Sequence, residues 1–280
     1  MESKRTAVVT GASSGIGEYV ARELARQSWR VILLGRNPAR SKAAVERIRA
    51  DIPGADVDLV IADLSSLAEA RRAADEVAAK VDAIDLLVNN AGGTNPKRLV
   101  TPEGLEATFA GNHLGPFVLT ERLLPLIRTH ADARIVNVSS VGHTMIKDMM
   151  WDDLQMERGY NDNRAYFQSK LANVLWTREL ARRLAPQGIT VNAMHPGMVG
   201  SDFARRSNLV TRVVYGLARP FVRTVGEGAD TVLWLATDPA VRGATGGYYH
   251  NRKPGRTTPA ALSDEGAARL WRISEELARL

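Results

Sequence analysis

The sequence predicts an α/β fold in which a single doubly wound parallel sheet carries helices on both faces. Short runs rich in Val, Ile and Leu alternate with longer segments whose apolar residues recur at i, i+3 and i+4. Parallel strands need right-handed crossover helices, so this alternation predicts a sheet that binds ligands beyond the carboxyl ends of its strands. No internal repeat or linker interrupts the 280 residues, so we expect one domain over 1–280.

The expected elements follow one another in strand–helix order. Strands are expected at 6–10, 31–34, 57–62, 84–88, 134–138 and 189–194, and helices at 18–28, 38–50, 65–82, 103–130, 164–186 and 226–237. Two connections, 141–163 and 198–225, are longer than ordinary loops between such elements. We expect both to lie on the substrate side.

Composition excludes several classes of function. The chain is 45% hydrophobic and 24% charged, which is typical of a globular protein. The absence of Cys excludes disulfides, thiolate catalysis and Cys-ligated metals, and we expect no other metal site. The net charge of +6 comes without a basic block, so we expect no nucleic-acid partner. No apolar run is long enough to span a bilayer, and we expect a cytoplasmic protein.

A glycine-rich turn, Thr10-Gly11-Ala12-Ser13-Ser14-Gly15-Ile16-Gly17, joins the first expected strand to the first helix. Glycines at this point permit a tight turn and let the backbone approach a pyrophosphate, which the amides and dipole of the helix start then hold. This position predicts a Rossmann-type dinucleotide site. The expected cofactor-binding residues of the turn are Gly11, Ser13, Ser14, Gly15, Ile16 and Gly17.

The second expected strand ends at Gly35-Arg36-Asn37, where an acidic residue would bind the adenosine ribose of NAD. A carboxylate would repel a 2′-phosphate, whereas an arginine fork pairs with one. We therefore expect Arg36 and Asn37 to bind the cofactor, and NADP to be preferred over NAD. A solvated loop arginine is the alternative interpretation of Arg36 in a chain with 37 basic residues.

Tyr166 and Lys170 stand four residues apart on an expected helix, which places them on one face, one turn apart. A phenol has a pKa near 10 and is a poor acid–base catalyst at neutral pH. A neighbouring ammonium favours the phenolate and lowers that pKa. The spacing therefore predicts that Tyr166 transfers a proton with the help of Lys170.

Further motifs follow the expected strands in a fixed order. They are Asp63-Leu64, Asn89-Asn90-Ala91-Gly92, Asn112, Ser139-Ser140, Tyr166 with Lys170, and Pro196-Gly197. Together with the glycine turn, this set resembles the classical subgroup of the short-chain dehydrogenase/reductase family over residues 5–250. The resemblance implies an oxidoreductase that moves a hydride between nicotinamide and a carbonyl or alcohol.

The resemblance also implies a role for each motif. Asp63 and Leu64 would lie along the adenine, and Asn90, Ala91 and Gly92 would border the cofactor. Ser140 would orient the substrate oxygen while Tyr166 acts as general acid/base. Lys170 would hold the nicotinamide ribose, and Asn112 would support a water that relays protons to Lys170; a helix asparagine that bonds the neighbouring backbone is the alternative for Asn112.

Two serines, Ser139 and Ser140, follow the fifth expected strand. The family places its catalytic hydroxyl at the second serine, and alternation along a strand aims the two side chains oppositely, which favours Ser140. Pro196, Gly197 and Val199 would lie against the nicotinamide. Ser201 replaces the usual Thr of the family, and its hydroxyl would contact the carboxamide or a phosphate of the cofactor. We expect His195, next to this motif, to be structural and not catalytic.

The substrate side resembles the retinol-dehydrogenase-like branch of the family, in Asn-His-Leu-Gly at 112–115, in the long gap from Ser140 to Tyr166 and in the helix after Tyr166. This branch implies a lipophilic or bulky ketone, aldehyde or alcohol. The residues Met145, Met149, Met150, Trp151 and Met156 either line an adaptable pocket or pack an irregular loop.

Two interpretations concern surfaces. Residues 210–225 carry apolar side chains every four residues and predict an amphipathic lid helix, with association to a membrane surface as the alternative. The family resemblance implies a homodimer or homotetramer formed through the helices at 103–130 and 164–186.

Two other functions remain open at this point. A non-catalytic dinucleotide sensor would use the same sheet, but it would not need Asn112, Ser140, Tyr166 and Lys170 together. An extended-type sugar epimerase or dehydratase usually has a larger C-terminal substrate domain than the residues after 198 allow.

Overall fold

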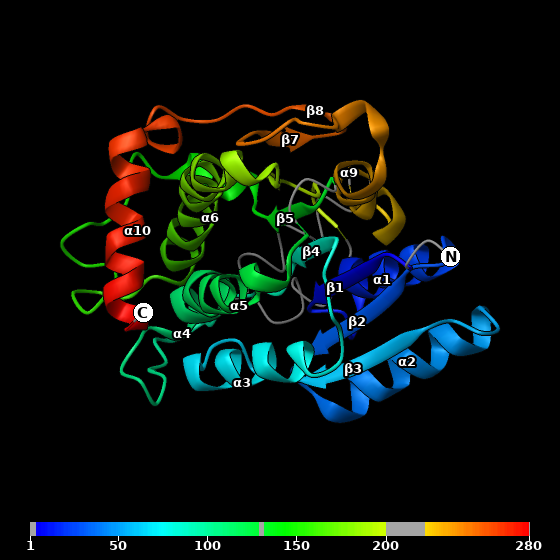
Figure 1. Cartoon of the computed structure of the whole chain (residues 1–280). Helices are drawn as coiled ribbons and strands as arrows, with labels where there is room; N and C mark the ends of the chain where they lie inside the picture. Colours follow the sequence, from blue (N-terminus) through cyan, green and yellow to red (C-terminus); the bar gives the residue numbers. More distant parts are fainter. Residues whose placement is uncertain (1–3, 129–131, 200–221, 280) are drawn as a thin grey trace.

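Eight strands form one sheet in the order β3-β2-β1-β4-β5-β6-β7-β8 in the computed structural model, which describes residues 4–128, 132–199 and 222–279 (Figure 1). Neighbouring strands run parallel from β3 to β7, and only β8 is antiparallel to its neighbour β7. The strands are β1 Thr6–Thr10, β2 Arg30–Gly35, β3 Val57–Ile61, β4 Leu86–Asn89, β5 Arg134–Val138, β6 Thr190–Met194, β7 Tyr248–His250 and β8 Lys253–Pro254.

The strand order changes direction at β1, which pairs with β2 on one side and with β4 on the other. Every residue of β1 is buried, as expected for a central parallel strand covered on both faces. A ligand of such a sheet binds in the crevice where the order reverses, beyond the carboxyl ends of β1 and β4. The glycine-rich turn directly follows β1 at this point.

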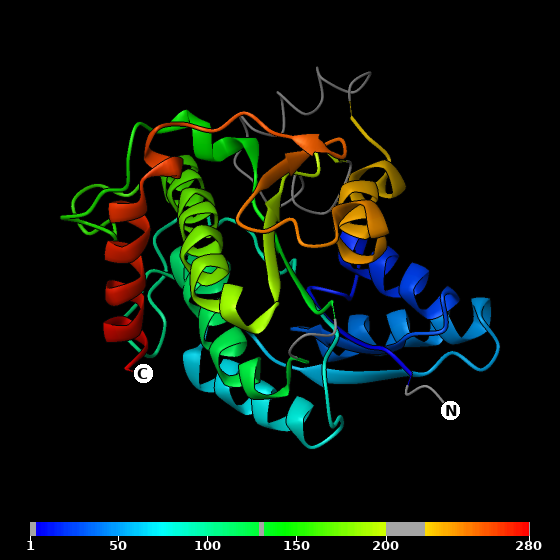
Figure 2. The same cartoon turned by 45° about the horizontal axis from the view of Figure 1, so that its top comes forward.

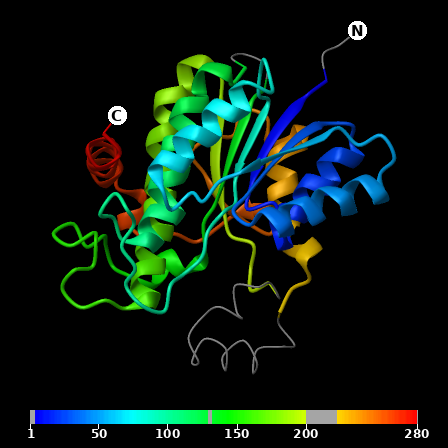
Figure 3. The same ribbon diagram turned by 90° about the horizontal axis from the view of Figure 1, so that it is seen from below.

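Helices cover both faces of the sheet, each over its own apolar core (Figure 3). One layer consists of α1 Gly15–Arg26, α2 Pro38–Asp51 and α9 Val225–Thr237. The other consists of α3 Leu67–Ala78, α4 Ala107–Phe109, α5 Gly115–Leu123 and α6 Asp162–Leu184, with α10 Asp264–Ala278 packed outside α6. Figure 2 shows α10 beside α6, on the side away from the strands. The expected doubly wound sheet with helices on both faces is thus confirmed.

The prediction of a single helix over 103–130 is wrong. Within this range, α4 passes into a π-helical turn, Ala110–Leu114, then into α5, and a 3-10 turn follows at Leu124–Leu126. Pro116 and Pro125 have no backbone N–H, so neither can continue the regular bonding of an α-helix. The Gly115 N–H bonds instead to the Ala110 carbonyl, five residues back, which makes the turn a π-helix.

Three C-terminal elements, β7, β8 and α10, were not expected from the sequence. β7 and β8 have three and two residues, too few to show an alternating pattern. α10 has an apolar face whose Ala267, Leu270 and Trp271 are buried against the α6 layer. No helix in the described ranges is both long and apolar enough to cross a membrane.

Candidate active site

The ends of β1 and β4 are tied together below the glycine turn. The Thr10 hydroxyl oxygen accepts hydrogen bonds from the backbone N–H groups of Asn90 and Ala91, each at 3.0 Å. The Asn90 side chain returns a bond to the Thr10 carbonyl at 2.9 Å. Gly11 has a φ of +66°, and a Cβ there would lie 2.9 Å from the Ala91 Cα. Only glycine fits this close approach.

The start of α1 presents backbone amides at this same crevice. Ser14 is the extended residue before α1, and its side chain makes no capping bond to the helix. The first amides of any helix have no acceptor within it, so those of Gly15, Ile16 and Gly17 fit an anionic pyrophosphate. Ser13 lies against the end of β2, because a Cβ added to Gly35 would be 3.4 Å from the Cβ of Ser13. The residues that the sequence predicts to bind the cofactor phosphates therefore lie together.

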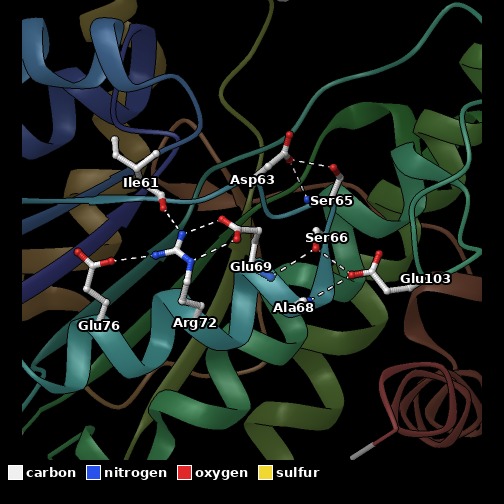
Figure 4. Close-up of polar contacts among 9 residues, drawn as sticks. All are labelled: Ile61, Asp63, Ser65, Ser66, Ala68, Glu69, Arg72, Glu76 and Glu103. Atoms are coloured by element: carbon white, nitrogen blue, oxygen red, sulfur yellow. Dashed lines mark hydrogen bonds and ion pairs between the residues drawn. The ribbon is translucent and has the colours of Figure 1, made fainter.

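The carboxyl ends of β2 and β3 bring Arg36 and Asp63 together. Arg36 Nη1 lies 3.5 Å from Asp63 Oδ2, and the Arg36 side chain is 60% exposed. The other oxygen of Asp63 accepts from the Ser65 amide at 3.0 Å and the Ser65 hydroxyl at 2.8 Å (Figure 4). The Asp63 carboxylate thus holds the turn into α3. Asn37 caps α2 by accepting from the Arg40 amide, which explains its place in the sequence without a cofactor.

The start of α3 is fixed by a second set of contacts. Glu103 Oε1 accepts from the Ser66 hydroxyl at 2.8 Å and from the Ala68 amide at 3.2 Å (Figure 4). Leu64, between this turn and β3, is buried in the core. Leu64 and Asp63 therefore have a rigid backbone beside the crevice.

Asn112 lies in the π-helical turn and is nearly fully buried. Its side-chain oxygen accepts from the Gly93 amide at 2.8 Å, and its nitrogen donates to the Gly93 carbonyl and to the Ser169 hydroxyl, each at 2.8 Å. A Cβ on Gly92 would lie 3.0 Å from Asn112 Oδ1 and 3.3 Å from Lys170 Nζ. The structure thus brings the loop after β4, the π-turn and α6 together at one place.

Ser139 and Ser140 follow β5 and differ in environment. The Ser139 hydroxyl is buried and donates to the Lys170 backbone carbonyl at 2.8 Å. The half-buried Ser140 hydroxyl accepts from the Gly142 amide at 3.0 Å and so retains its own proton to donate to a ligand. His143, which the sequence reasoning did not select, contacts the Ser140 carbonyl through Nδ1 at 2.6 Å.

Tyr166 and Lys170 share one face of α6, as their spacing predicts. Lys170 Nζ lies 5.6 Å from the centre of the Tyr166 ring and donates to the Val138 carbonyl at 2.9 Å. Lys170 is only 3% exposed, and this burial lowers its pKa to about 8. Tyr248 on β7 was also not selected from the sequence. Burial raises the pKa of Tyr248, and the nearby Tyr166 raises it further. A three-residue strand gives no sequence signal for this neighbour.

The segment after β6 lies beside the crevice. Gly197 has a φ of +83°, and a Cβ there would lie 2.6 Å from the Arg223 Cδ. Val199 is buried and pairs with Arg223 in a short parallel bridge, while Pro196 is half-buried. Ser201 lies outside the described residues, as does most of the lid helix expected at 210–225.

His195, which directly precedes this segment, is held by packing. Burial and nearby charges lower its pKa to about 3, and its ring stacks on His250 at 4.9 Å. The neutral, stacked ring agrees with the structural role expected for His195.

The methionines of 141–163 divide between the two interpretations. Met149 and Met156 are buried in the core, which is loop packing, whereas Met145 is 67% exposed in the short helix that follows Ser140. Val141, in the same short helix, is 49% exposed. Apolar side chains thus face solvent in the short helix that Ser140 caps.

Comparison with known proteins gives concordant results. A family model described as short chain dehydrogenase matches residues 5–210. Human retinol dehydrogenase 12 is 40% identical over 273 residues, 98% of this chain and 86% of that protein. Human retinol dehydrogenase 14 is 38% identical over 292 residues, 99% of this chain and 87% of that protein.

Solved structures share the fold over most of the chain. A crystal structure of a protein from Mycobacterium paratuberculosis has a TM-score of 0.79 at 33% identity, covering 99% of this chain and 94% of that one. The Pseudomonas aeruginosa RhlG/NADP active-site complex has a TM-score of 0.69 at 29% identity, covering 88% of this chain and 94% of that one. The chain belongs to the short-chain dehydrogenase family, in its retinol-dehydrogenase-like branch, and is an NAD(P)-dependent oxidoreductase acting on alcohol or carbonyl groups.

Proposed function

We propose that this oxidoreductase prefers NADP(H), converts a lipophilic or bulky ketone or aldehyde and the corresponding alcohol into one another, and uses Tyr166 as general acid/base. The observation that carries the proposal is the buried Lys170 ammonium 5.6 Å from the Tyr166 ring, on one face of α6. A cation held this close in a region of low dielectric favours the phenolate form of the tyrosine. The phenol can therefore give up its proton more readily than a phenol in water.

The residues at the carboxyl ends of β1 and β4 would accommodate a dinucleotide. The bare Gly11 and Gly92 leave room where a Cβ would strike backbone or side chains, and the start of α1 supplies amides for the pyrophosphate. When bound, NADPH would supply the hydride. Residues at the ends of β3, β4 and β6 would hold the adenine and nicotinamide parts, namely Asp63, Leu64, Asn90, Ala91, Pro196 and Val199.

The preference for NADP rests on Arg36. Its guanidinium is exposed, and its contact with Asp63 at 3.5 Å is too long for a hydrogen bond. One Asp63 oxygen already accepts hydrogen bonds from the Ser65 amide and hydroxyl, so Asp63 stabilises the turn into α3 without Arg36. Arg36 can therefore turn toward a 2′-phosphate at little cost, and exchange a weak exposed ion pair for a charge-assisted fork.

Each polar group has one task in the proposed reduction. The Ser140 hydroxyl donates to the substrate carbonyl oxygen, and Tyr166 donates the proton that this oxygen needs after hydride addition. Lys170 stabilises the resulting phenolate. Its pKa of about 8 lets it exchange protons with solvent at working pH.

The path for reprotonation runs past Asn112. Pro116 has no N–H, so it cannot donate to the Asn112 carbonyl four residues earlier, which leaves that carbonyl able to hold a water. The buried Asn112 side chain is fully bonded to Gly93 and Ser169, so it fixes the turn. A water held there would pass protons to Lys170.

Substrate class rests on the surface beside Ser140. Val141 and Met145 expose apolar side chains there, and the relatives named retinol dehydrogenases bear the name of a lipophilic alcohol. An apolar substrate gains affinity by covering such side chains. Both observations favour a lipophilic or bulky substrate over a small polar one.

The decisive test is Tyr166→Phe, with Tyr160→Phe as matched control. Tyr160 lies in the 141–163 segment and its hydroxyl donates to the Asn95 carbonyl at 2.7 Å, so the control also removes a bonded phenol hydroxyl. We expect kcat of Tyr166→Phe to fall at least about 100-fold, as loss of a positioned acid costs, while NADPH affinity stays within a few-fold. A Tyr166→Phe enzyme that retains more than about a tenth of wild-type kcat would contradict the proton-donor role.

A further inference from the structure

The residue after Asn112 connects the π-turn to the C-terminal helix. His113 is fully buried, and its Nε2 lies 2.8 Å from the Ser274 hydroxyl on α10, a residue that is also fully buried. The two residues are 161 positions apart in sequence. A polar contact between fully buried groups is costly to break, because each partner would lose its bond without gaining water.

Packing holds the His113 ring in one orientation. Its centre lies 5.2 Å from that of Phe109, 5.8 Å from that of Trp176 and 6.1 Å from that of Phe117. Burial lowers the His113 pKa to about 3, more than Asn173 on α6 raises it, so the ring is neutral at working pH. The neutral ring is wedged among three aromatic rings, and its Nε2 meets the Ser274 hydroxyl of α10, while Asn173 of α6 is a further polar neighbour.

A second contact seats α10 on the same region. Trp271, one turn before Ser274, packs edge-on against Phe117 of α5 at 5.0 Å, and the Arg183 guanidinium of α6 lies 4.0 Å from its ring centre. α10 therefore contacts the residues directly after the π-turn as well as the turn itself.

The π-turn must be held accurately for Asn112 to keep its bonds. All three side-chain bonds of Asn112 measure 2.8 Å, and they join the loop that borders the cofactor to the helix that carries Tyr166 and Lys170. A hydrogen bond lengthened by about 1 Å is effectively lost. A π-turn is also wider than an α-helical turn, and here only the three-residue α4 precedes it.

We propose that Ser274 is a positioning residue for the reaction: through His113 it holds the π-turn that carries Asn112, so that α10 supports the active site from the far side of the helix layer. The inference rests on the proposed role of Asn112 in the proton path. It assigns a catalytic consequence to a helix that lies wholly outside the part of the chain matched by the family model.

The test compares Ser274→Ala with Ser263→Ala. Ser263 caps α10, accepting from the Gly266 amide at 2.9 Å, and within the described residues no hydrogen bond joins it to the π-turn. Removing the cap weakens α10 without touching His113. Both variants are measured for Tm, for kcat and for KM toward NADPH. Ser274→Cys, whose slightly larger thiol is a much weaker hydrogen-bonding group, replaces Ser274→Ala if that variant does not fold.

We expect Ser274→Ala to lower kcat by about tenfold while KM for NADPH stays within about twofold, the pattern of a lost transition-state contribution. Ser263→Ala should keep kcat within about twofold of wild type even if its Tm falls as far as the Tm of Ser274→Ala. His113→Phe should reproduce the loss, and adding Ser274→Ala to it should cost little more, because both changes break one contact.

Equal kcat in Ser274→Ala and Ser263→Ala at similar Tm would overturn the inference. Asn112→Ala separates this failure from that of the proposed function. If Asn112→Ala loses activity while Ser274→Ala does not, only the link through α10 is wrong. If Asn112→Ala keeps wild-type kcat, the proposed proton path fails and the link fails with it.

Discussion

The two helix layers of this protein differ sharply in what they bury. In the layer of α1, α2 and α9, the buried polar side chains are Ser41 and Thr231. α6 alone, in the other layer, buries Gln168, Ser169, Lys170, Asn173, Thr177 and Glu179. The first layer offers the cofactor phosphates little besides backbone amides, whereas the second supplies the side chains proposed for proton transfer.

The difference shows where a chemical function costs stability. Backbone amides at a helix start need partners in any case, so binding a pyrophosphate there requires no buried polar side chain. An acid–base site needs polar groups fixed in a region of low dielectric before the substrate arrives. Such groups destabilise the fold unless they are fully bonded, and α6 therefore carries the dense network that includes Asn112 and Ser139.

The largest predicted effect is that of Lys170→Met, which should lower kcat at least about 100-fold, because the phenolate loses its cation. The same change should stabilise the protein without cofactor at neutral pH, since it removes a buried charge. Burial lowers the Lys170 pKa from 10.5 to about 8, so between these values the folded state binds fewer protons than the unfolded state. Stability of wild type should therefore rise with pH across this window relative to the variant, and the cost of burial should be fully present below about pH 8.

Urea unfolding of both proteins at pH 7 and at pH 10, without cofactor, checks this prediction. A variant that is less stable than wild type at pH 7 would show that Lys170 is a stabilising residue and would remove the contrast between the layers. Retention of more than about a tenth of kcat would contradict its part in proton transfer.

An intermediate effect is predicted for Arg36→Asp, directly after β2. Losing an arginine–phosphate pair and adding a like charge should lower the ratio of kcat/KM for NADPH over NADH at least about tenfold, which corresponds to about 1.4 kcal/mol. Arg47→Ala is the matched control, because Arg47 of α2 is a basic residue whose exposed guanidinium pairs with Glu18 at 2.7 Å. An unchanged ratio in Arg36→Asp would return Arg36 to a solvated loop residue.

The smallest effect concerns the oligomeric state of the protein, for which we predict no effect on kcat. The family resemblance implies a homodimer or homotetramer through α5 and α6, and α10 covers part of both helices (Figure 1). A dimer on this layer would therefore include the outer face of α10. Light scattering at micromolar concentration tests the prediction of an oligomer, and a monomer would remove it.

The first half of the fold could be predicted because its signals are local. β1 and β5 begin and end where the apolar runs do, and the glycine turn lies between β1 and α1 as expected. The spacing of Tyr166 and Lys170 on one helix places them together regardless of the rest of the chain. Such features depend on a few neighbouring residues.

Most of the unpredicted features depend on contacts between distant residues. The interrupted helix at 103–130 is the exception, because its prolines are local; the π-turn that precedes Pro116 carries Asn112 and His113. Nothing near His113 in sequence indicates that its partner is Ser274. The proximity of Tyr248 to Tyr166 likewise follows from strand order in the sheet, which a three-residue strand does not reveal.

The most direct test of the central claim is turnover of a panel of bulky apolar aldehydes and ketones with NADPH and with NADH, followed by the absorbance of the reduced cofactor. We expect wild type to oxidise NADPH and to have a higher kcat/KM with NADPH than with NADH, and we expect Tyr166→Phe to lose turnover. A protein that binds NADPH but turns over no carbonyl, and no alcohol in the reverse direction, would not be the proposed oxidoreductase.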